Sequence, residues 1–423
     1  MTPATHAAFD TQSEVDLHTS SERTRAQRQS GTPDIRLSIE ADLSAIESEW
    51  RAFERHADCT VFQAFDWVSV WQRHVGARKG AVPVVVTGRD SAGGLMFLLP
   101  LAIEKFGPAR RLIWLGSELC DYNAPLLAAD FSCRIDQENF LRLWSEIAGR
   151  LQSHPDFQHD FVHFEKMPEK VGAQANPMLG LPVMRNASNA YMTQLGGDWE
   201  TFYTAKRSSS TRRRDRTKRK KLGEFGEVKF VDPAGVEDVS DSFDTLMSQK
   251  SKQFAAMGVP DIFARPGYPE FFREMATTKR DIVHVSRLDV GAVPAALNLG
   301  LTFRGCYYHV LASYTDAELS KYGPGAAHLH ELMGYAIKRG CGAFDFTIGD
   351  ERYKRDWCDT ELKLFDHVTF ATVRGAAVAR PLQAARIAKR WIKQTPAVWN
   401  AVTKMRALAG SLRGKPAAEK SAD

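Results

Sequence analysis

Long apolar runs are missing from this sequence, and no stretch of its 423 residues approaches the roughly 20 consecutive apolar residues that a membrane-spanning helix needs. The first residues, MTPATHAAFDTQSEVDLHTS, also lack the basic start and apolar run of a secretory signal. We therefore expect a cytoplasmic protein, or one held peripherally at the inner membrane surface.

Several common catalytic motifs are absent as well. The sequence contains no GxSxG, no Walker phosphate loop and no complete GxGxxG, and His330-Glu331 begins a zincin-like pattern without its second histidine. The six cysteines are scattered and form no Cys-x-x-Cys pair, so they are expected to be free thiols, most of them buried. These absences disfavour nicotinamide chemistry and metal hydrolysis, and we expect no metal site.

What the sequence does contain is typical of a globular α/β protein. Apolar residues make up 43% of a chain longer than one hydrophobic core usually organises, which predicts two domains. Residues 1–33 have few large apolar side chains and are expected to form a disordered arm. We place the first domain at 34–185, the second, with the probable active site, at 186–378, and a basic helical tail at 379–423.

The two halves show a similar order of predicted elements, although they share little literal sequence. Apolar spacing predicts helices near 43–53, 65–71 and 137–151 in the first half and near 239–257, 269–277 and 325–339 in the second. Strands are expected at 81–87, 95–104, 111–115 and 160–166, then at 191–194, 227–231, 281–288, 295–302, 306–314 and 343–347. The fold class is therefore mixed α/β, with a sheet flanked by helices in each half.

A glycine-rich junction follows the last strand of the predicted meander. Gly323-Pro324-Gly325 opens a helix, where uncovered backbone N–H groups and the helix dipole favour a phosphate or pyrophosphate. An ordinary turn between a strand and a helix is the alternative explanation.

A second candidate region is the stretch FDFTIGDERYKRDW, in which a buried strand breaks at Gly349 into a polar turn. Binding groups gather past the carboxyl ends of strands in α/β sheets, which places Asp350, Tyr353 and Lys354 for chemistry. The alternative is a solvated loop with Trp357 as a packing anchor. On the neighbouring strand, His309 is a candidate general base, although a lone strand histidine is more often a core residue.

Positive charge is concentrated in one segment, because residues 206–221 hold ten Lys or Arg and one Asp while the whole chain carries only +5. Such a run attracts polyanions, including nucleic acid, an anionic lipid surface, a nucleotide-bearing cofactor or a phosphorylated substrate. A solvated helix at the domain junction is the alternative, because the run contains no aromatic residue for stacking. Within the run, Arg212 and Lys218 are our candidate substrate-binding residues.

The C-terminal stretch PLQAARIAKRWIKQTPAVWNAVTKMRALAGSLRGKP is also basic and contains Trp391 and Trp399. This pattern suits an amphipathic helix on an anionic membrane. A helix that packs back on its own domain is the alternative, with Pro396 expected to divide it into two pieces.

Several of these segments together resemble a known family. The meander, the GPG-opened helix, FQAFDWVSVWQRH, the DYNAP loop and above all FDFTIGDERYKRDW are similar to the CelD/BcsL group of GNAT-superfamily acyltransferases. The resemblance covers about residues 36–375. It implies two tandem GNAT-like domains, similar in fold to Fem-type transferases, and a link to cellulose or exopolysaccharide production.

The resemblance also implies an acyl-CoA donor with no metal, whose pyrophosphate would lie at the helix start formed by Tyr322, Gly323, Gly325 and Ala326. Here Tyr-Gly-Pro-Gly replaces the usual Gln/Arg-x-x-Gly-x-Gly/Ala of GNAT enzymes. Asp121 and Tyr122 of the DYNAP loop are predicted to bind substrate.

The sequence thus predicts an acyltransferase acting on a sugar, amino sugar or small amine. His309 or Asp350 would be the base, Tyr353 the acid and Lys354 a charge partner for phosphate or carboxylate. One alternative is a Fem-like transferase that uses aminoacyl-tRNA, with the basic run on the RNA backbone, although nucleic acid is the less expected partner. Another is a non-catalytic accessory protein of a polysaccharide synthase complex.

Overall fold

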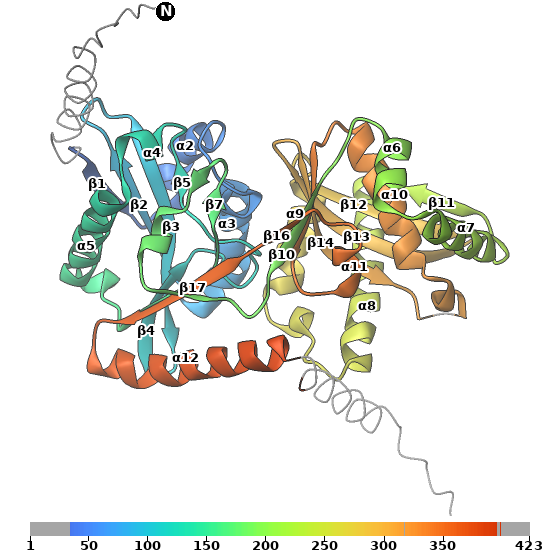
Figure 1. The fold of residues 1–423 in the computed structure, drawn as a ribbon. Coiled ribbons are helices and arrows are strands. Elements are labelled where there is room, and N and C mark those ends of the chain that lie inside the picture. Colours follow the sequence, from blue (N-terminus) through green and yellow to red (C-terminus); the bar gives the residue numbers. More distant parts are fainter. Residues whose placement is uncertain (1–33, 317, 396–397, 399–423) are drawn as a thin grey trace, which may run out of the picture.

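The computed structural model describes residues 34–316, 318–395 and 398. The arm expected at residues 1–33 and nearly all of the tail beyond Thr395, including Pro396, lie outside these residues. The described chain forms two α/β units side by side, each built on one twisted sheet (Figure 1).

The sheet of the first unit has the strand order β1-β2-β3-β4-β6-β17-β9, with β5 paired to β3 at one side. Its neighbours are antiparallel except for β4 and β6, which run parallel. The strands are β1 Arg36–Glu40, β2 Val82–Arg89, β3 Leu95–Phe106, β4 Ala109–Trp114, β5 Leu126–Leu127, β6 Phe161–Pro168, β9 Val183–Arg185 and β17 Leu364–Phe370. A small hairpin, β7 Lys170–Val171 and β8 Gln174–Ala175, stands apart.

The second sheet repeats this pattern strand for strand, with the order β11-β12-β13-β14-β15-β10-β16. Again one neighbouring pair, β14 and β15, runs parallel and the others run antiparallel. The strands are β10 Ala190–Gln194, β11 Val228–Val231, β12 Val283–Val290, β13 Val293–Phe303, β14 Cys306–Tyr314, β15 Ala343–Ile348 and β16 Thr360–Leu362. The repeated element order expected from the sequence is therefore present at the level of topology.

The second half of the chain supplies a strand to the first sheet. β9 and β10 stand in different sheets on either side of position 186, as the predicted boundary requires. β17, however, lies inside the first sheet between β6 and β9, although the sequence placed residues 364–370 in the second domain. This strand ties the two units together beyond their surface contacts.

Helices connect the strands in the order that hydrophobic spacing predicts. Ile46, Trp50 and Phe53 form the buried face of α2, as three- and four-residue spacing requires. The α-helices are α2 Leu43–Glu54, α3 Phe65–Trp71, α4 Phe131–Arg134, α5 Gln137–Ser153, α6 Trp199–Lys206, α7 Ser209–Gly223, α8 Val236–Ala256, α9 Tyr268–Thr278, α10 Pro324–Lys338, α11 Arg352–Arg355 and α12 Val373–Gln394. Short helical turns include the π-helical η2 Gln72–Gly76 and the 3-10 turn η7 Glu318–Tyr322.

The basic segment forms two helices where the sequence suggested one. The chain turns at Arg207 and Ser208, and the Ser208 hydroxyl accepts from the backbone N–H of Thr211, so it caps the start of α7. The sequence did not indicate this N-cap, because Ser208 lies within a run dominated by charged residues.

The two units meet through an apolar interface with charged edges. Trp67 of α3 packs edge to face against Phe271 of α9, with ring centroids 4.9 Å apart. Beside them Asp66 pairs with Lys279 at 2.7 Å, and His74 Nε2 lies 2.7 Å from Glu274. One continuous hydrophobic cluster runs through both units. Among the described residues, no helix is long and apolar enough to cross a membrane.

Candidate active site

The parallel strands β14 and β15 separate part-way along their length. They pair at Cys306, Tyr307 and Tyr308, opposite Ala343, Phe344 and Asp345, and beyond this point each follows its own course. Both strands are irregular there, because β14 shifts register against β13 around His309 and β15 shifts against β10 between Asp345 and Ile348. The split leaves the carboxyl ends of two neighbouring strands apart, where α/β folds commonly bind ligands.

A strained residue marks this split in both units. Thr347 in β15 has φ +58°, and Lys166, at the equivalent bulge in β6, has φ +57°. A positive φ is unfavourable for a β-branched residue such as threonine. The Thr347 hydroxyl donates to the carbonyl of His309 at 3.2 Å and so bridges the separated strands.

The DYNAP loop of the first unit reaches this split. Tyr122 Oη donates to Asp345 Oδ1 at 2.7 Å, and the same oxygen accepts from the Thr347 backbone N–H. Burial raises the pKa of Asp345 to about 7, although both hydrogen bonds oppose the rise. Burial also raises the pKa of its neighbour Asp121, against the attraction of Lys166. Two carboxyl groups with raised pKa values thus lie where the units meet.

His309 is buried at the back of the split. With the Asn298 amide oriented to satisfy its neighbours, the amide nitrogen donates to His309 Nε2 at 3.2 Å. Burial lowers the pKa of His309 to about 3. The side chain is therefore neutral and a weak base at physiological pH, which disfavours the general-base role that the sequence suggested and matches the alternative of a core histidine.

The polar turn after β15 holds its three candidate residues in different environments. Lys354 is 4% exposed, and its ammonium donates to the carbonyls of Thr347 and Ile348 at 3.3 and 2.9 Å. It also pairs with Glu351 at 3.0 Å. Lys354 therefore closes the end of β15, and its burial argues against the expected role as a charge partner for substrate.

The other two residues of this turn point elsewhere. Asp350 accepts from the Asn189 backbone N–H at 3.2 Å and lies 3.6 Å from the Lys393 ammonium, so it faces the inter-unit connection. The Tyr353 side chain is partly exposed and lies edge to face with Phe346, with ring centroids 6.3 Å apart. Burial of its hydroxyl and the charge of Glu351 raise the Tyr353 pKa, which makes it a weaker acid. The expected quartet of His309, Asp350, Tyr353 and Lys354 does not converge on one point.

The start of α10 has the geometry expected of an anion site. Gly323 has φ +69° at the N-cap and supplies no side-chain cap, and the first turn of α10 contains no acidic residue. The Lys218 ammonium lies 3.8 Å from where a Cβ of Gly323 would be. A Cβ on Gly325 would meet the ring of Tyr314 at 3.5 Å. Helix dipole and lysine therefore present positive charge at the same place.

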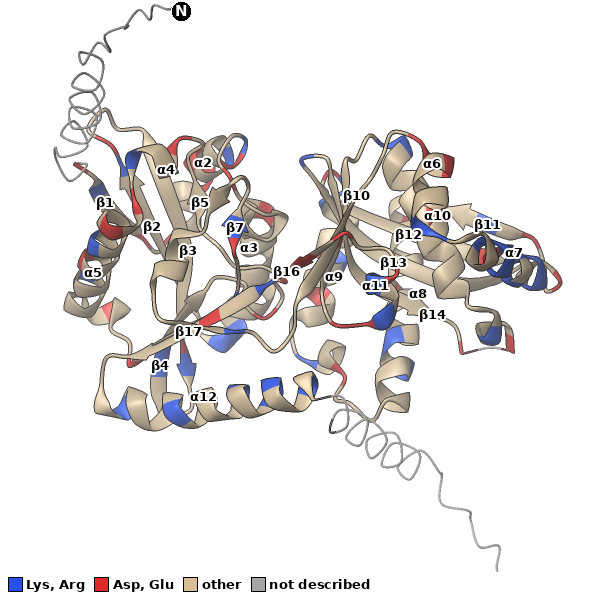
Figure 2. Cartoon of the chain, viewed as in Figure 1, with Lys and Arg blue, Asp and Glu red and all other residues tan. Residues whose placement is uncertain are grey.

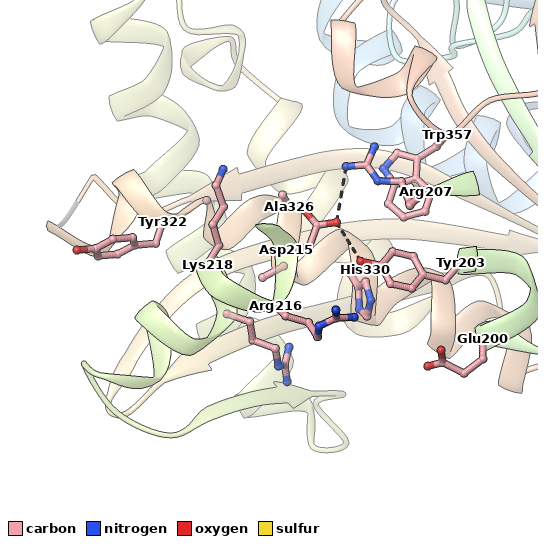
Figure 3. Close-up of a pocket in the computed structure, with 13 residues that line it drawn as sticks. Glu200, Tyr203, Arg207, Asp215, Arg216, Lys218, Tyr322, Ala326, His330 and Trp357 are labelled. Atoms are coloured by element: carbon pink, nitrogen blue, oxygen red, sulfur yellow. Dashed lines mark hydrogen bonds and ion pairs between the residues drawn. The ribbon is translucent and has the colours of Figure 1, made fainter. Parts of the chain in front are cut away.

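A cavity of about 240 Å³ opens beside this helix start, between α6, α7 and α10 (Figure 3). Tyr203, Asp215 and Arg207 meet on one wall, where Tyr203 Oη donates to Asp215 at 3.0 Å and Arg207 lies 3.7 Å from the same carboxylate. The lining residues are Glu200, Tyr203, Arg207, Asp215, Arg216, Lys218, Arg219, Tyr322, Gly323, Ala326, Ala327, His330 and Trp357. The cavity combines aromatic surface with an excess of positive charge.

The sequence found part of this cavity. Tyr322, Gly323, Ala326 and Lys218 line it, whereas Arg212 donates to the carbonyls of Thr204 and Arg207 and so closes the end of α6. Gly325 does not line the cavity, because its Cβ direction faces the Tyr314 ring. The other predicted residues, Asp121 and Tyr122, belong to the split described above.

Sequence reasoning missed the aromatic wall and the buried carboxyl group. His330 lies edge-on against Tyr203 with centroids 4.7 Å apart, and Arg207 stacks on Trp357 at 4.8 Å. No local pattern joins these positions, because they meet only after α6 packs on α10. Asp345 did carry a signal, since an acidic residue between two phenylalanines in a buried strand needs a partner.

In the first unit, β4 and β6 form the split that is equivalent to the one between β14 and β15. There the DYNAP loop of the same unit closes the split. β4 and β6 pair at Arg111 and Leu112 and then separate. Asn123 of the DYNAP loop bonds to β6 there, with its backbone N–H on the Lys166 carbonyl at 3.1 Å and its side chain on the Glu165 carbonyl at 3.0 Å. The two splits therefore differ in what occupies them.

Comparison with known proteins agrees with this geometry. A family profile described as an acetyltransferase (GNAT) domain matches residues 209–355, which contain α7, α10 and the split. No curated protein matches the chain. The second unit thus contains a GNAT-type acetyltransferase domain.

Solved structures resemble the whole two-unit arrangement. A conserved protein of unknown function from Bacteroides thetaiotaomicron has a TM-score of 0.51 at 11% identity, covering 79% of this chain and 100% of that one. FemX has a TM-score of 0.53 at 10% identity, covering 77% and 96%. A tandem GNAT protein from the clavulanic acid biosynthesis pathway has a TM-score of 0.44 at 11% identity, covering 80% and 99%. The GNAT profile over the second unit and the repetition of its sheet topology in the first make the fold a pair of GNAT-like units in tandem.

Proposed function

We propose that the protein is an acyl-CoA-dependent acyltransferase whose second unit binds the donor and whose acceptor enters where the two units meet. The observation that carries the proposal is the combination of the β14–β15 split with the positively charged start of α10. The family profile over residues 209–355 supports the same unit as the donor site. In the first unit the equivalent split is filled by Asn123, which argues against a second donor site.

The residues at the helix start fit the diphosphate of a CoA ester. Lys218 and the dipole of α10 would bind its negative charge, and the aromatic wall of the cavity offers surface for a nucleotide base. The acyl group would then point towards the split, where an amine or hydroxyl of the acceptor attacks the thioester carbon and the thiolate leaves as a thiol after protonation.

Asp121 is the residue that we assign as proton acceptor from the attacking group. It is only partly buried, unlike Asp345 and His309, so an acceptor can reach it, and burial raises its pKa above the ordinary value. A sugar or amino sugar of a surface polysaccharide is the acceptor class that the family resemblance favours.

Titration calorimetry with acetyl-CoA and longer acyl-CoAs tests the donor. Wild type should bind, and Ala326→Trp should not, because Ala326 lines the cavity in the first turn of α10 and an indole there would fill it. Asp121→Asn should retain donor binding and lose about 100-fold or more in kcat. Asp241→Asn is the matched control, because Asp241 is exposed on α8 far from the split in sequence. Absence of binding by wild type would reject the CoA proposal.

A second candidate is a transferase that uses aminoacyl-tRNA. Its support is the resemblance in fold to FemX together with the exposed cations of α7, such as Arg213, Arg214 and Lys220. Binding of tRNA with a steep dependence on salt, together with no binding of acyl-CoA, would favour this candidate.

A further inference from the structure

α12 is fixed to the first unit by one face. A Cβ on Gly375 would lie 1.9 Å from a main-chain carbonyl, so the helix backbone contacts the sheet end directly. Ala379 is completely buried, and Arg386 pairs with the carboxylates of Glu165 and Asp366. These contacts set the rotation of the helix about its axis, and therefore which residues face outward.

The outward face of α12 is apolar except at Arg380. Val373 is 89% exposed, Ile387 60% and Trp391 61%, which are high values for large apolar side chains. They continue an exposed stripe at three- and four-residue spacing that consists of Val373, Ala377, Pro381, Ala384, Ile387, Ala388 and Trp391. No described residue covers this stripe.

The charge of α12 has one sign. Its 22 residues include six Lys or Arg and no Asp or Glu, and Figure 2 shows the basic positions spread along the helix beneath the first unit. Arg380 is exposed within the apolar stripe, between Ala377 and Ala384, and Lys389 is exposed beside it. An apolar stripe with cations on its flanks, held parallel to a surface, is the pattern of an interfacial helix.

We infer that α12 docks on an anionic lipid bilayer, with Ile387 and Trp391 inserted at the boundary between headgroups and acyl chains. The exposed cations of α12 meet the anionic lipid headgroups. A second copy of this chain is a poorer occupant, because pairing the two faces would bring like charges together. This inference does not depend on the identity of the acyl donor.

The position of α12 gives the docking a consequence for the candidate site. Near its end, Lys393 contacts the Ser188 hydroxyl and lies 3.6 Å from Asp350, in the turn that follows β15. A bilayer that binds the outward face would therefore lie next to the junction of the two units. An acceptor carried in the membrane would be presented to that junction.

Sedimentation of the full-length protein with vesicles tests the inference. We expect binding to vesicles of equal parts phosphatidylglycerol and phosphatidylcholine, weaker binding at high salt, and little binding to phosphatidylcholine alone. The double variant Ile387→Gln/Trp391→Gln should lower the partition coefficient about tenfold or more. Arg380→Gln/Lys389→Gln should lower it less and reduce the salt dependence.

Val236→Gln is the matched control, because Val236 is 60% exposed at the start of α8 in the other unit and should leave vesicle binding unchanged. Thermal unfolding checks that the variants keep their fold. The inference is overturned if the wild-type protein does not bind anionic vesicles, or if the Ile387→Gln/Trp391→Gln variant binds them as strongly as wild type. It is equally overturned if sedimentation velocity shows that this variant converts a dimer to a monomer without changing vesicle binding.

Discussion

The phenol of Tyr122 in the first unit donates a hydrogen bond to Asp345 Oδ1 in the second, at 2.7 Å and out of contact with solvent. This bond joins the DYNAP loop to the point where β14 and β15 separate. It is a direct polar link between the loop that the first unit contributes and the strand ends that would receive the acyl group.

Tyr122→Phe should destabilise the protein by about 1 to 2 kcal/mol, because it leaves a buried carboxyl group with one donor fewer. The Tyr122 bond lowers the pKa of Asp345, so its loss should raise that pKa further. Urea unfolding measures the first effect, and titration of Asp345 by NMR measures the second. Tyr314→Phe is the control, since the Tyr314 ring is half exposed. Equal stability of the two variants would contradict the prediction.

Asp345→Asn should change how stability depends on pH. The folded-state pKa of Asp345 is about 7 against an ordinary value of 3.8, so between these values the folded protein binds more protons than the unfolded chain. Its contribution to the free energy of unfolding is therefore greatest at low pH and declines as pH rises through this window.

By linkage, this decline amounts to at most about 4 kcal/mol. The asparagine variant cannot show it, so it should gain stability relative to wild type between pH 5 and pH 8. Urea unfolding of both proteins at each pH measures the difference, in which all other titrating groups cancel. A difference that does not vary with pH would contradict the shifted pKa.

The sequence predicted the helices and strands of both units because their apolar periodicity is local. Alternation in 283–290 and the stripe of α2 depend on neighbours within a few residues. The position of β17 in the first sheet was not predicted, because the sequence indicated no strand at residues 364–370 and the partners of that strand in β6 lie far away in sequence. Lys218 could be predicted as a binding residue because it lies in the basic run that the sequence shows. The roles of Arg207 and Trp357 could not, because only packing brings these two residues to the cavity.

Lys218→Ala should weaken acyl-CoA binding about tenfold, because it removes the cation nearest to Gly323. Lys220→Ala is the matched control, since Lys220 lies on the same helix, is exposed and does not line the cavity. Calorimetry at two salt concentrations measures both. If the two variants weaken binding equally, the effect comes from the overall charge of α7 and not from a built site.

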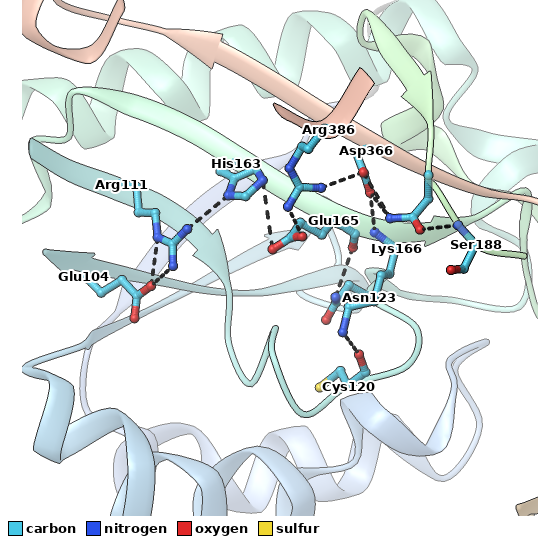
Figure 4. Close-up of polar contacts among 11 residues, drawn as sticks. Glu104, Arg111, Cys120, Asn123, His163, Glu165, Lys166, Ser188, Asp366 and Arg386 are labelled. Carbon is cyan, nitrogen blue, oxygen red and sulfur yellow. Dashed lines mark hydrogen bonds and ion pairs between the residues drawn. The ribbon is translucent and has the colours of Figure 1, made fainter. Parts of the chain in front are cut away.

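Arg386→Met should destabilise the protein by about 3 kcal/mol. Figure 4 shows Arg386 between Glu165 and Asp366, within a network that runs through His163 to Arg111 and Glu104. Asp366 has 3% of its side chain exposed, and removal of its cation leaves a buried charge unpaired.

Arg380→Met on the same helix is the control for Arg386→Met and should change stability by less than about 0.5 kcal/mol. Chemical unfolding measures both variants. A similar small change in the two would mean that Asp366 keeps adequate partners without Arg386, for example the Asn186 amide at 2.8 Å.

Thr347 allows a test of backbone strain at the split. Thr347→Ala and Thr347→Gly both lose the hydroxyl bond to the His309 carbonyl, but only glycine accepts φ +58° without cost. In an ordinary strand the glycine variant would be the less stable of the two. Here it should be the more stable, by about 1 kcal/mol, because the left-handed conformation penalises any Cβ. The same pair of substitutions at Lys166, with φ +57° in the other unit, should give the same order. The free energies of unfolding of the glycine and alanine variants measure this difference. A more stable alanine variant at either position would mean that the backbone leaves the positive-φ conformation once the side chain is removed.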